Sequence, residues 1–216
     1  MKVVEIFESI DGEGIRVGFP VTFIRLFGCN LRCSYCDSRY ACEGTGYTEW
    51  SIGEILRQVE SYGHKRVTLT GGEPLIHKDV YVLIDFLIKS GYEVNIETDG
   101  AVDISNLRIS NNIIITLDYK CPSSLMEDKM VLSNFDYLRP KDVLKFVVGN
   151  KTDLLKAEYI INKYDLQRKC NIYFSPVFGK IESVQIVDFI LKHHLEDVRI
   201  QLQLHKFIWE PDKRGV

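Results

Sequence analysis

Short apolar runs alternate with amphipathic segments of helical period along most of the chain, and no other feature limits its fold as strongly. The runs are rich in Val, Ile, Leu and Phe, as expected of parallel strands that helices cover. We predict strands at residues 21–27, 66–70, 93–97, 113–118, 143–148, 171–174 and 198–202. The alternation predicts an α/β fold whose parallel strands form a partial (β/α) barrel.

Four segments carry apolar residues at the spacing of one helix face. They cover residues 52–59, 80–88, 152–164 and 183–194. Ser51 and Glu54 form a capping box at the start of the first segment, and Gly91 supplies a C-cap for the second. Residues 121–141 show no clear period and predict a long irregular loop. We expect the whole chain, residues 1–216, to form one domain.

The composition is that of an ordinary globular protein, with 45% hydrophobic and 26% charged residues and a net charge of −3. The sequence has no block of lysines or arginines, which argues against a nucleic-acid partner. Acidic residues among the first eight argue against a secretory signal, and no run approaches the about 18 apolar residues of a membrane span. We therefore expect a cytoplasmic protein whose cysteines are metal ligands or ordinary thiols.

Three cysteines follow the first apolar run, in the spacing Cys29-x3-Cys33-x2-Cys36. Three thiolates in one loop indicate a metal site. A structural zinc takes four ligands, usually as two separated pairs, and Cys42 could supply a fourth but lacks a paired spacing. An electron-carrying cluster also takes four cysteines, in different runs. Three thiolates on a four-iron cluster leave one iron open, which is what binding of a substrate or cofactor requires.

Polar residues collect where the predicted strands end, and ligands of parallel α/β folds bind at that edge. The segments are Thr70-Gly71-Gly72-Glu73-Pro74, Glu97, Asp118-Tyr119-Lys120, Ser175-Pro176 and His205. Two adjacent glycines allow close approach of the backbone to a ligand, although, taken alone, they favour a tight turn. Lys145 lies inside an apolar strand, where an unpaired ammonium is costly, so it either reaches into a ligand cavity or snorkels out.

Two charged residues bear on the substrate. The carboxylate of Glu13, in the flexible acidic segment 8–14, can accept two parallel hydrogen bonds from an amidine-like pair of N–H groups, as on a guanine or pterin edge. Arg25 lies within an apolar strand and needs either a buried anion or an outward path. A substrate carboxylate paired in a bidentate manner would suit it.

The cysteine loop, followed one strand later by Gly71-Gly72-Glu73-Pro74, resembles the signature of the radical S-adenosylmethionine (radical SAM) superfamily. In that superfamily three cysteines hold a [4Fe-4S] cluster, and the methionyl amino and carboxylate groups chelate the open iron. One electron then splits the sulfonium, and the resulting 5′-deoxyadenosyl radical takes a hydrogen atom from the substrate. The resemblance implies the superfamily's partial barrel and its two cofactors.

Segments near both ends of the chain resemble one particular family within this superfamily. Residues 8–14, 23–26, 36–38 and 203–209 resemble the 7-carboxy-7-deazaguanine synthase family. The family converts 6-carboxy-5,6,7,8-tetrahydropterin to 7-carboxy-7-deazaguanine with loss of ammonia, on the route to queuosine. It uses S-adenosylmethionine catalytically and requires Mg²⁺. The resemblance implies hydrogen abstraction at C6 of the pterin, ring contraction, a flavodoxin-like electron donor and a homodimer.

Matching positions in that family imply the site residues. The [4Fe-4S] ligands would be Cys29, Cys33 and Cys36, and the Mg²⁺ ligand would be Ser38. The cofactor-binding residues would be Tyr35, Cys36, Asp37, Gly71, Gly72, Glu73, Glu97, Asp118, Tyr119, Lys120, Ser175 and Pro176. The substrate-binding residues would be Ile10, Asp11, Gly12, Glu13, Arg25, Thr70 and His205.

Two of these positions depart from the family pattern. Asp11 stands where Gln is common, and an ionised carboxylate cannot donate a hydrogen bond. Ser38 replaces a common Thr but keeps the oxygen donor. The chain also continues beyond Pro211, where some relatives present a terminal carboxylate to the substrate. The residues leave two alternatives open: an activase of a glycyl-radical enzyme, and a non-catalytic zinc or iron–sulfur protein.

Overall fold

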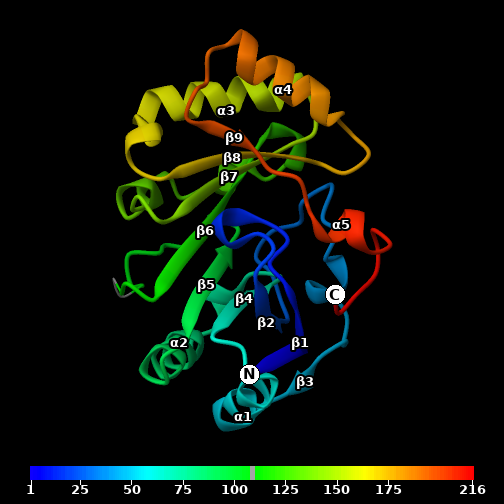
Figure 1. The fold of residues 1–216 in the computed structure, drawn as a ribbon, viewed down its shortest axis with the longest axis vertical. Coiled ribbons are helices and arrows are strands. Elements are labelled where there is room, and N and C mark those ends of the chain that lie inside the picture. Colours follow the sequence, from blue (N-terminus) through cyan, green and yellow to red (C-terminus); the bar gives the residue numbers. More distant parts are fainter. Residues whose placement is uncertain (108–109) are drawn as a thin grey trace.

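The computed structural model describes residues 1–107 and 110–216, and in this part of the chain nine strands form one curved sheet (Figure 1). They are β1 (Lys2–Ile10), β2 (Pro20–Leu26), β3 (Thr48–Glu49), β4 (Arg66–Gly71), β5 (Glu93–Thr98), β6 (Ile113–Lys120), β7 (Val143–Val148), β8 (Asn171–Pro176) and β9 (Val198–Ile200). Their spatial order is β3-β1-β2-β4-β5-β6-β7-β8-β9, with β3 and β9 at the two edges. Neighbours from β2 to β9 are parallel, whereas β1 is antiparallel to β2 and β3. The predicted partial parallel barrel is confirmed.

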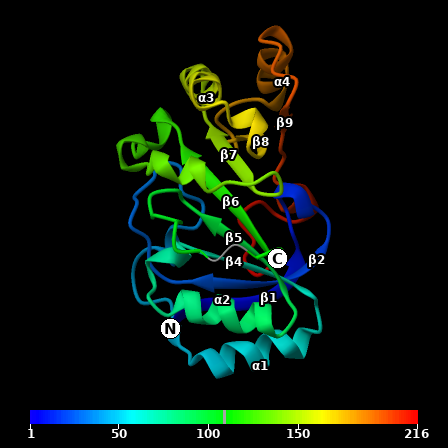
Figure 2. The same ribbon diagram turned by 90° about the vertical axis from the view of Figure 1, so that its left-hand side faces the viewer.

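Helices cover the outer face of this sheet. They are α1 (Ile52–Tyr62), α2 (Val80–Lys89), α3 (Lys151–Tyr164) and α4 (Ser183–Lys192), and a short α5 (His205–Ile208) follows β9. Figure 2 shows α1 and α2 side by side along one half of the sheet, and α3 and α4 along the other. The capping box of α1 is formed as predicted: the Glu54 amide donates to Ser51 Oγ at 3.3 Å, and the Ser51 amide donates to Glu54 Oε2 at 2.8 Å.

The core lies between the sheet and the helices, and its strand residues fix which side chains face inward. Ile24, Leu69 and Ile96 are aligned on β2, β4 and β5 and are fully buried against the helices. Each such side chain contributes about 1.5–3 kcal/mol on burial. Because successive side chains of a strand point to opposite faces, the next residues along the strands point into the barrel. Arg25 and Thr70, which pair across β2 and β4, are two of these inward residues.

The structure corrects several details of the sequence-based expectations. Residues 8–10, expected to be flexible, belong to β1, where Glu8 pairs with Thr22 in the antiparallel ladder. Helix α2 ends with Ser90 as its C-cap, and Gly91 follows with a φ of 87°. Residues 121–141 are more ordered than expected, because they contain 3₁₀ helices. These are Pro122–Ser124, Glu127–Lys129 and Leu132–Asp136.

Strand lengths differ slightly from the prediction as well. Strands β6 and β8 extend to Lys120 and Pro176, so that two polar segments expected to follow the strands are their last residues. Strand β9 ends at Ile200, earlier than predicted.

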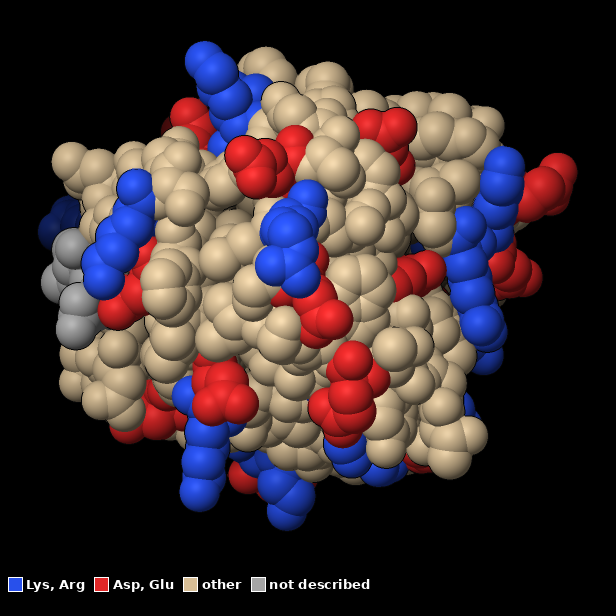
Figure 3. All heavy atoms as spheres, turned by 90° about the horizontal axis from the view of Figure 1, so that it is seen from below, with Lys and Arg blue, Asp and Glu red and all other residues tan. Residues whose placement is uncertain are grey.

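The face seen from below carries positive and negative side chains interspersed with uncharged ones (Figure 3). Within residues 1–107 and 110–216, no helix has the length and apolar character needed to cross a membrane.

Candidate active site

The cysteine loop begins where β2 ends and is closed by backbone hydrogen bonds. The Gly28 amide donates to the Ala41 carbonyl at 2.7 Å, which joins the two ends of the loop. Inside it, the Leu31 amide donates to Cys29 Sγ at 3.3 Å. A backbone N–H aimed at sulfur favours the thiolate, the form in which cysteine binds metals.

Hydrogen bonding within the loop favours the thiolate form at two of its three cysteines. Hydrogen bonding to Cys42 lowers the pKa of Cys36 to about 6 and also lowers the pKa of Cys29. Burial raises the pKa of Cys33. The pKa of Cys42 is raised, because hydrogen bonding with the sulfurs of Cys29 and Cys36 favours its protonated form. Cys29, Cys33 and Cys36 line one cavity and their chemistry fits the ligands of an iron–sulfur cluster, with Cys42 as a protonated thiol beside them.

The paired glycines at the end of β4 bring this strand against the cysteine loop. A Cβ at Gly72 would lie 2.2 Å from the Gly28 carbonyl oxygen and 2.8 Å from Cys29 Cβ. Gly71 has a φ of 146°, and a Cβ there would lie 2.1 Å from the Leu26 carbonyl oxygen. Both positions therefore require glycine, and they hold unhindered backbone groups beside the thiols.

Glu73 follows the glycines but faces away from the cavity. Its buried carboxylate accepts hydrogen bonds from the Leu75 amide at 2.9 Å, the Asp99 amide at 2.5 Å and the Thr98 hydroxyl at 3.0 Å. Burial raises the pKa of Glu73 well above its usual value. Its side chain fixes the turn after β5, and the predicted contact with the cofactor has no direct support from this geometry.

A row of charged side chains follows on β5, β6 and β7. Asp118 lies 3.0 Å from Lys120 Nζ and 3.1 Å from Lys145 Nζ. Lys145 thus reaches into the cavity rather than snorkelling out. Burial would raise the pKa of Asp118, but the two lysines hold it below its usual range. Burial raises the pKa of Glu97 to about 7, although Lys145 opposes the shift, so Glu97 exchanges its proton near neutral pH.

The segment after β1 brings Glu13 into the same cavity. Glu13 Oε2 accepts a hydrogen bond from Lys145 Nζ at 2.7 Å, and Glu13 Oε1 accepts one from the Ser175 hydroxyl at 3.2 Å. The Gly14 amide donates to Gln201 Oε1 at 2.7 Å and ties this segment to the chain after β9. Glu13 is therefore held at both oxygens before any ligand binds.

Asp11 lies only two residues earlier but belongs to a different environment. It accepts hydrogen bonds from Arg16 Nε and from the Thr68 hydroxyl, both at 2.7 Å. Arg16 also donates to the carbonyl oxygens of Val67 and Glu93, each at 3.2 Å. Burial raises the pKa of Asp11, partly offset by Arg16. The Asp11 side chain lies outside the cavity, so a substrate contact is left to its backbone and stays a prediction.

Arg25 and His205 are oriented by neighbours within the cavity wall. Glu5 Oε1 accepts hydrogen bonds from Arg25 Nε at 2.7 Å and from the Tyr40 hydroxyl at 3.1 Å. His205 packs directly on the backbone of Gly12, where a Cβ would lie 2.2 Å from its Nδ1 atom. Gly12 thus provides the space that the imidazole occupies.

The position predicted to bind Mg²⁺ lies next to another ion pair, Asp37 with Lys206. The Ser38 hydroxyl donates to Asp37 Oδ1 at 3.0 Å, and Lys206 Nζ lies 3.1 Å from Asp37 Oδ2. Burial would raise the pKa of Asp37, but Lys206 holds it below its usual range. Oxygen donors of this kind fit Mg²⁺, which prefers hard ligands and retains bound water.

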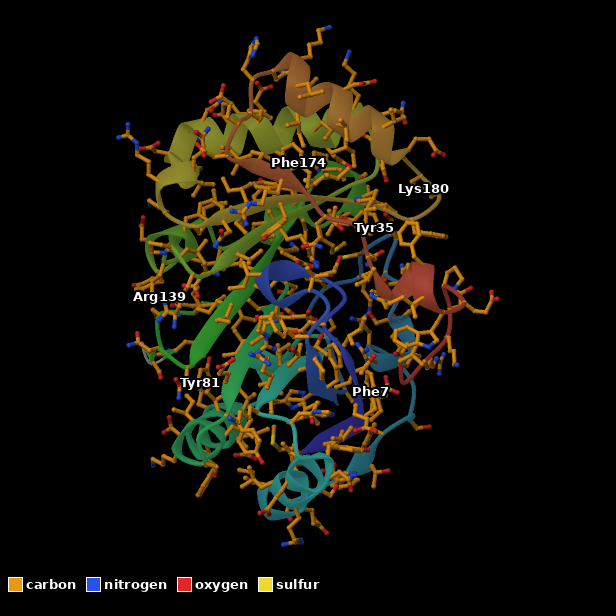
Figure 4. All side chains as sticks on the ribbon, in the orientation of Figure 1. Phe7, Tyr35, Tyr81, Arg139, Phe174 and Lys180 are labelled. Carbon is orange, nitrogen blue, oxygen red and sulfur yellow. The ribbon has the colours of Figure 1, made fainter. Side chains whose placement is uncertain are left out.

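These groups surround one continuous cavity of about 650 Å³. Phe7 on β1 and Tyr35 in the cysteine loop, both labelled in Figure 4, line it from different elements. The predicted residues that line the cavity are Ile10, Gly12, Glu13, Arg25, Cys29, Cys33, Tyr35, Cys36, Asp37, Ser38, Thr70, Gly71, Gly72, Glu97, Asp118, Lys120, Pro176 and His205. Its volume is within the range of small-molecule sites.

Four predicted residues are not among those lining the cavity. They are Asp11, Glu73, Tyr119 and Ser175. Tyr119 is buried and donates through its hydroxyl to Glu127 Oε1 at 2.9 Å, and burial raises its pKa. Ser175 acts on the cavity through its contact with Glu13. These residues support the cavity from outside.

The sequence left open whether the C-terminal tail reaches the site, and residues 211–216 form one wall of the cavity. The Arg214 guanidinium carbon lies 3.7 Å from the centroid of the Tyr40 ring. Phe7 and Phe23, stacked with centroids 5.0 Å apart, add an aromatic surface that the sequence did not predict. The signal for Phe23 was its place two residues before Arg25 on one strand, since alternate residues share a face. No sequence pattern indicated where the tail lies.

Comparison with known proteins was decisive. The family model described as the radical SAM superfamily matches residues 23–130. A 7-carboxy-7-deazaguanine synthase from Clostridium acetobutylicum is 49% identical over 218 residues, covering 100% of this chain and 99% of the relative. Another from Methanospirillum hungatei is 42% identical over 213 residues, covering 98% of this chain and 86% of the relative. The chain belongs to the 7-carboxy-7-deazaguanine synthase family.

The fold of this chain is also similar to that of solved structures. The crystal structure of QueE from Escherichia coli matches with a TM-score of 0.70 and 23% sequence identity, covering 94% of this chain and 93% of that one. Membership of the 7-carboxy-7-deazaguanine synthase family makes this chain a radical SAM enzyme, with a [4Fe-4S] cluster and S-adenosylmethionine as the cofactors that the superfamily implies. The activase and zinc-protein alternatives are thereby set aside.

Proposed function

We propose that this chain converts 6-carboxy-5,6,7,8-tetrahydropterin to 7-carboxy-7-deazaguanine with release of ammonia. The observation that carries the proposal is that the three loop cysteines share one cavity with Glu13, Arg25 and His205. A radical must be generated close to the hydrogen that it removes, so both partners need a common site. The full-length relatives carry an enzyme name that states the product, 7-carboxy-7-deazaguanine.

On the cofactor side, Cys29, Cys33 and Cys36 would hold the cluster. When bound, the cluster supplies the single electron that cleaves S-adenosylmethionine. Backbone groups of Gly71 and Gly72 would accept hydrogen bonds from the methionyl amino group, which they can approach closely. Lys120 would pair with the methionyl carboxylate, since its ammonium lies at the cavity wall and Asp118 keeps it charged although burial opposes this.

On the substrate side, Glu13 would accept the paired N–H groups of the pterin. Arg25, already oriented by Glu5 at 2.7 Å, would bind the pterin carboxylate together with His205. Aromatic walls exclude water around the reacting carbon, at pterin C6. The residues of this chain thus bind, orient and desolvate the substrate.

The Ser38 hydroxyl, with Asp37 beside it, would serve a Mg²⁺ ion. Magnesium would share its remaining ligand positions between water and the substrate. Titration of Mg²⁺ into the chelated enzyme should raise the rate of product formation in the wild type and much less in Ser38→Ala. If the Mg²⁺ dependence of Ser38→Ala equals that of the wild type, Mg²⁺ does not bind at Ser38.

The substrate assignment can be tested directly. The full chain is reconstituted anaerobically with iron and sulfide and given dithionite, S-adenosylmethionine and the carboxytetrahydropterin. We expect 7-carboxy-7-deazaguanine and ammonia in equal amounts, with Cys170→Ala as the control variant because Cys170 is buried outside the cavity. If S-adenosylmethionine is cleaved reductively while no deazaguanine forms, the substrate assignment is wrong.

The proposal extends to the setting of the enzyme. A flavodoxin-like protein would donate the electron, in the cytoplasm, where reducing conditions keep the six cysteines from forming disulfides. We also propose a homodimer, on the resemblance to the family. Sedimentation of the purified chain at micromolar concentration tests this, and a mass equal to one chain would contradict it.

A further inference from the structure

Four charged side chains form a continuous row of ion pairs across the cavity. Lys145 Nζ lies 2.7 Å from Glu13 Oε2 and 3.1 Å from Asp118 Oδ1. Asp118 Oδ2 accepts a hydrogen bond from Lys120 Nζ at 3.0 Å. All four side chains line the cavity. We call Glu13, Lys145, Asp118 and Lys120 the ion-pair row.

Lys145 is the shared member of this row, and the sheet fixes its position. Lys145 on β7 is aligned with Asp118 on β6 in the parallel ladder, so the two side chains enter the cavity next to each other. Burial would lower the pKa of Lys145, but Asp118, Glu13 and Glu97 raise it well above its usual value. Its ammonium has three donors and can serve two carboxylates at once. A change at one end of the row therefore reaches the other end through one charged group.

The two ends of the row meet different ligands, and this step rests on the proposed function. Glu13 would accept N–H groups of the pterin, and Lys120 would pair with the carboxylate of S-adenosylmethionine. Each ligand must then compete with a partner inside the row. The pterin competes with Lys145 for Glu13, and the ligand carboxylate competes with Asp118 for Lys120.

We propose that Lys145 is a positioning residue that makes the two ligands bind cooperatively. When a ligand carboxylate draws Lys120 away, Asp118 retains its charge partner by drawing Lys145 closer. Lys145 then holds Glu13 less tightly, which frees a carboxylate oxygen for the pterin. The reverse sequence follows when the pterin binds first, because coupling between two sites is reciprocal.

The coupling is measured by calorimetric titration of the reconstituted full-length protein without a reductant, so that no turnover occurs. S-adenosylmethionine is titrated with and without saturating carboxytetrahydropterin, and the order is then reversed. We expect each ligand to raise the affinity for the other on the order of tenfold in the wild type. In Lys145→Met the ratio should fall to one, and Lys145→Arg should restore part of it.

Lys169→Met is the control, since Lys169 is also a lysine in an ion pair, with Asp136, but does not line the cavity. It should retain the tenfold ratio. Asp118→Asn interrupts the row at a second point and should also abolish the ratio, which covers the case in which Lys145→Met does not fold. Undiminished cooperativity in Lys145→Met or Asp118→Asn, or a wild-type ratio of one, would overturn the inference. Normal turnover with a ratio of one refutes only the coupling, whereas absence of deazaguanine product refutes the proposed function.

Discussion

The segment between β1 and β2 supplies an acid to each of two buried ion-pair groups, and only one of the two groups lines the cavity. Asp11 and Arg16 are enclosed, with side chains 3% and 7% exposed. Arg16 donates hydrogen bonds to Asp11, Thr68 and two backbone carbonyl oxygens. Glu13 and Lys145 line the cavity instead. A fully paired, enclosed group stabilises the fold, whereas a charged group facing a cavity is available to a ligand.

The largest effect is expected at the cysteine loop, which lines the cavity together with Glu13 and Lys145. Cys36→Ala should abolish product formation and lower the bound iron, because two thiolates do not hold the cluster. The melting temperature of the metal-free protein should stay within a few degrees of wild type. Iron analysis and an anaerobic product assay check both statements. Retained iron and activity would show that Cys42 can replace Cys36.

Arg16→Met probes the enclosed group. It leaves the Asp11 carboxylate buried without its cation, so the free energy of unfolding should fall by about 3–5 kcal/mol. Urea denaturation of the metal-free protein measures this, and Asp11→Asn combined with Arg16→Met should recover part of the loss. Activity per folded molecule should stay close to wild type. A loss below about 1 kcal/mol would place this pair with weak surface ion pairs.

Glu13→Gln probes the cavity-facing group at nearly the same point of the chain. The substitution removes a charge-assisted hydrogen bond to the pterin, so kcat/KM should fall on the order of tenfold to a hundredfold. Stability should change little, because Lys145 keeps Asp118 as a partner at 3.1 Å. Steady-state kinetics and thermal unfolding test the pair of expectations. Loss of stability without loss of kcat/KM would reverse the roles assigned to the two groups.

The smallest effect concerns the pH dependence of stability. The pKa of Glu97 is raised by burial to about 7, so the folded state holds a proton that the unfolded state releases above its ordinary value of 4.5. Stability therefore falls as pH rises from 4.5 through 7. Glu97→Gln should flatten this slope and be more stable than wild type at pH 8, by about 1–2 kcal/mol. Equal slopes for both proteins in urea titrations between pH 5 and pH 8 would contradict it.

Much of the fold was predictable because its signals are local. Continuous apolar runs such as residues 143–148 are strands since both faces are covered, and β7 spans Val143–Val148 as expected. Polar segments that follow such runs marked the cavity edge, because ligands of parallel α/β folds bind where the strands end. Strand β1 was not recognised, because its acidic residues Glu5 and Glu8 obscured an element that pairing with β2 and β3 stabilises. That residues 1–216 form a single domain stays a prediction.

The candidate site was predictable in outline but not in its pairings. Asp11 and Glu13 are both acids between glycines or apolar residues, and nothing local separates them. Their partners do: Arg16 lies five residues away, whereas Lys145 lies 132 residues away on another strand. The tail at residues 211–216 reaches the cavity through the turn at α5, and its sequence shows no period that would indicate such a path.

The open side of the barrel is spanned by isolated contacts rather than by a strand ladder. The Gly14 amide bonds Gln201 at 2.7 Å, and the Leu204 amide bonds the Gly12 carbonyl oxygen at 3.0 Å. A closed barrel fixes its circumference through strand number and stagger. Here the circumference is adjustable at this seam, so a redesigned enzyme could take a bulkier heterocycle by lengthening residues 11–19 or 201–204, with every strand left in register.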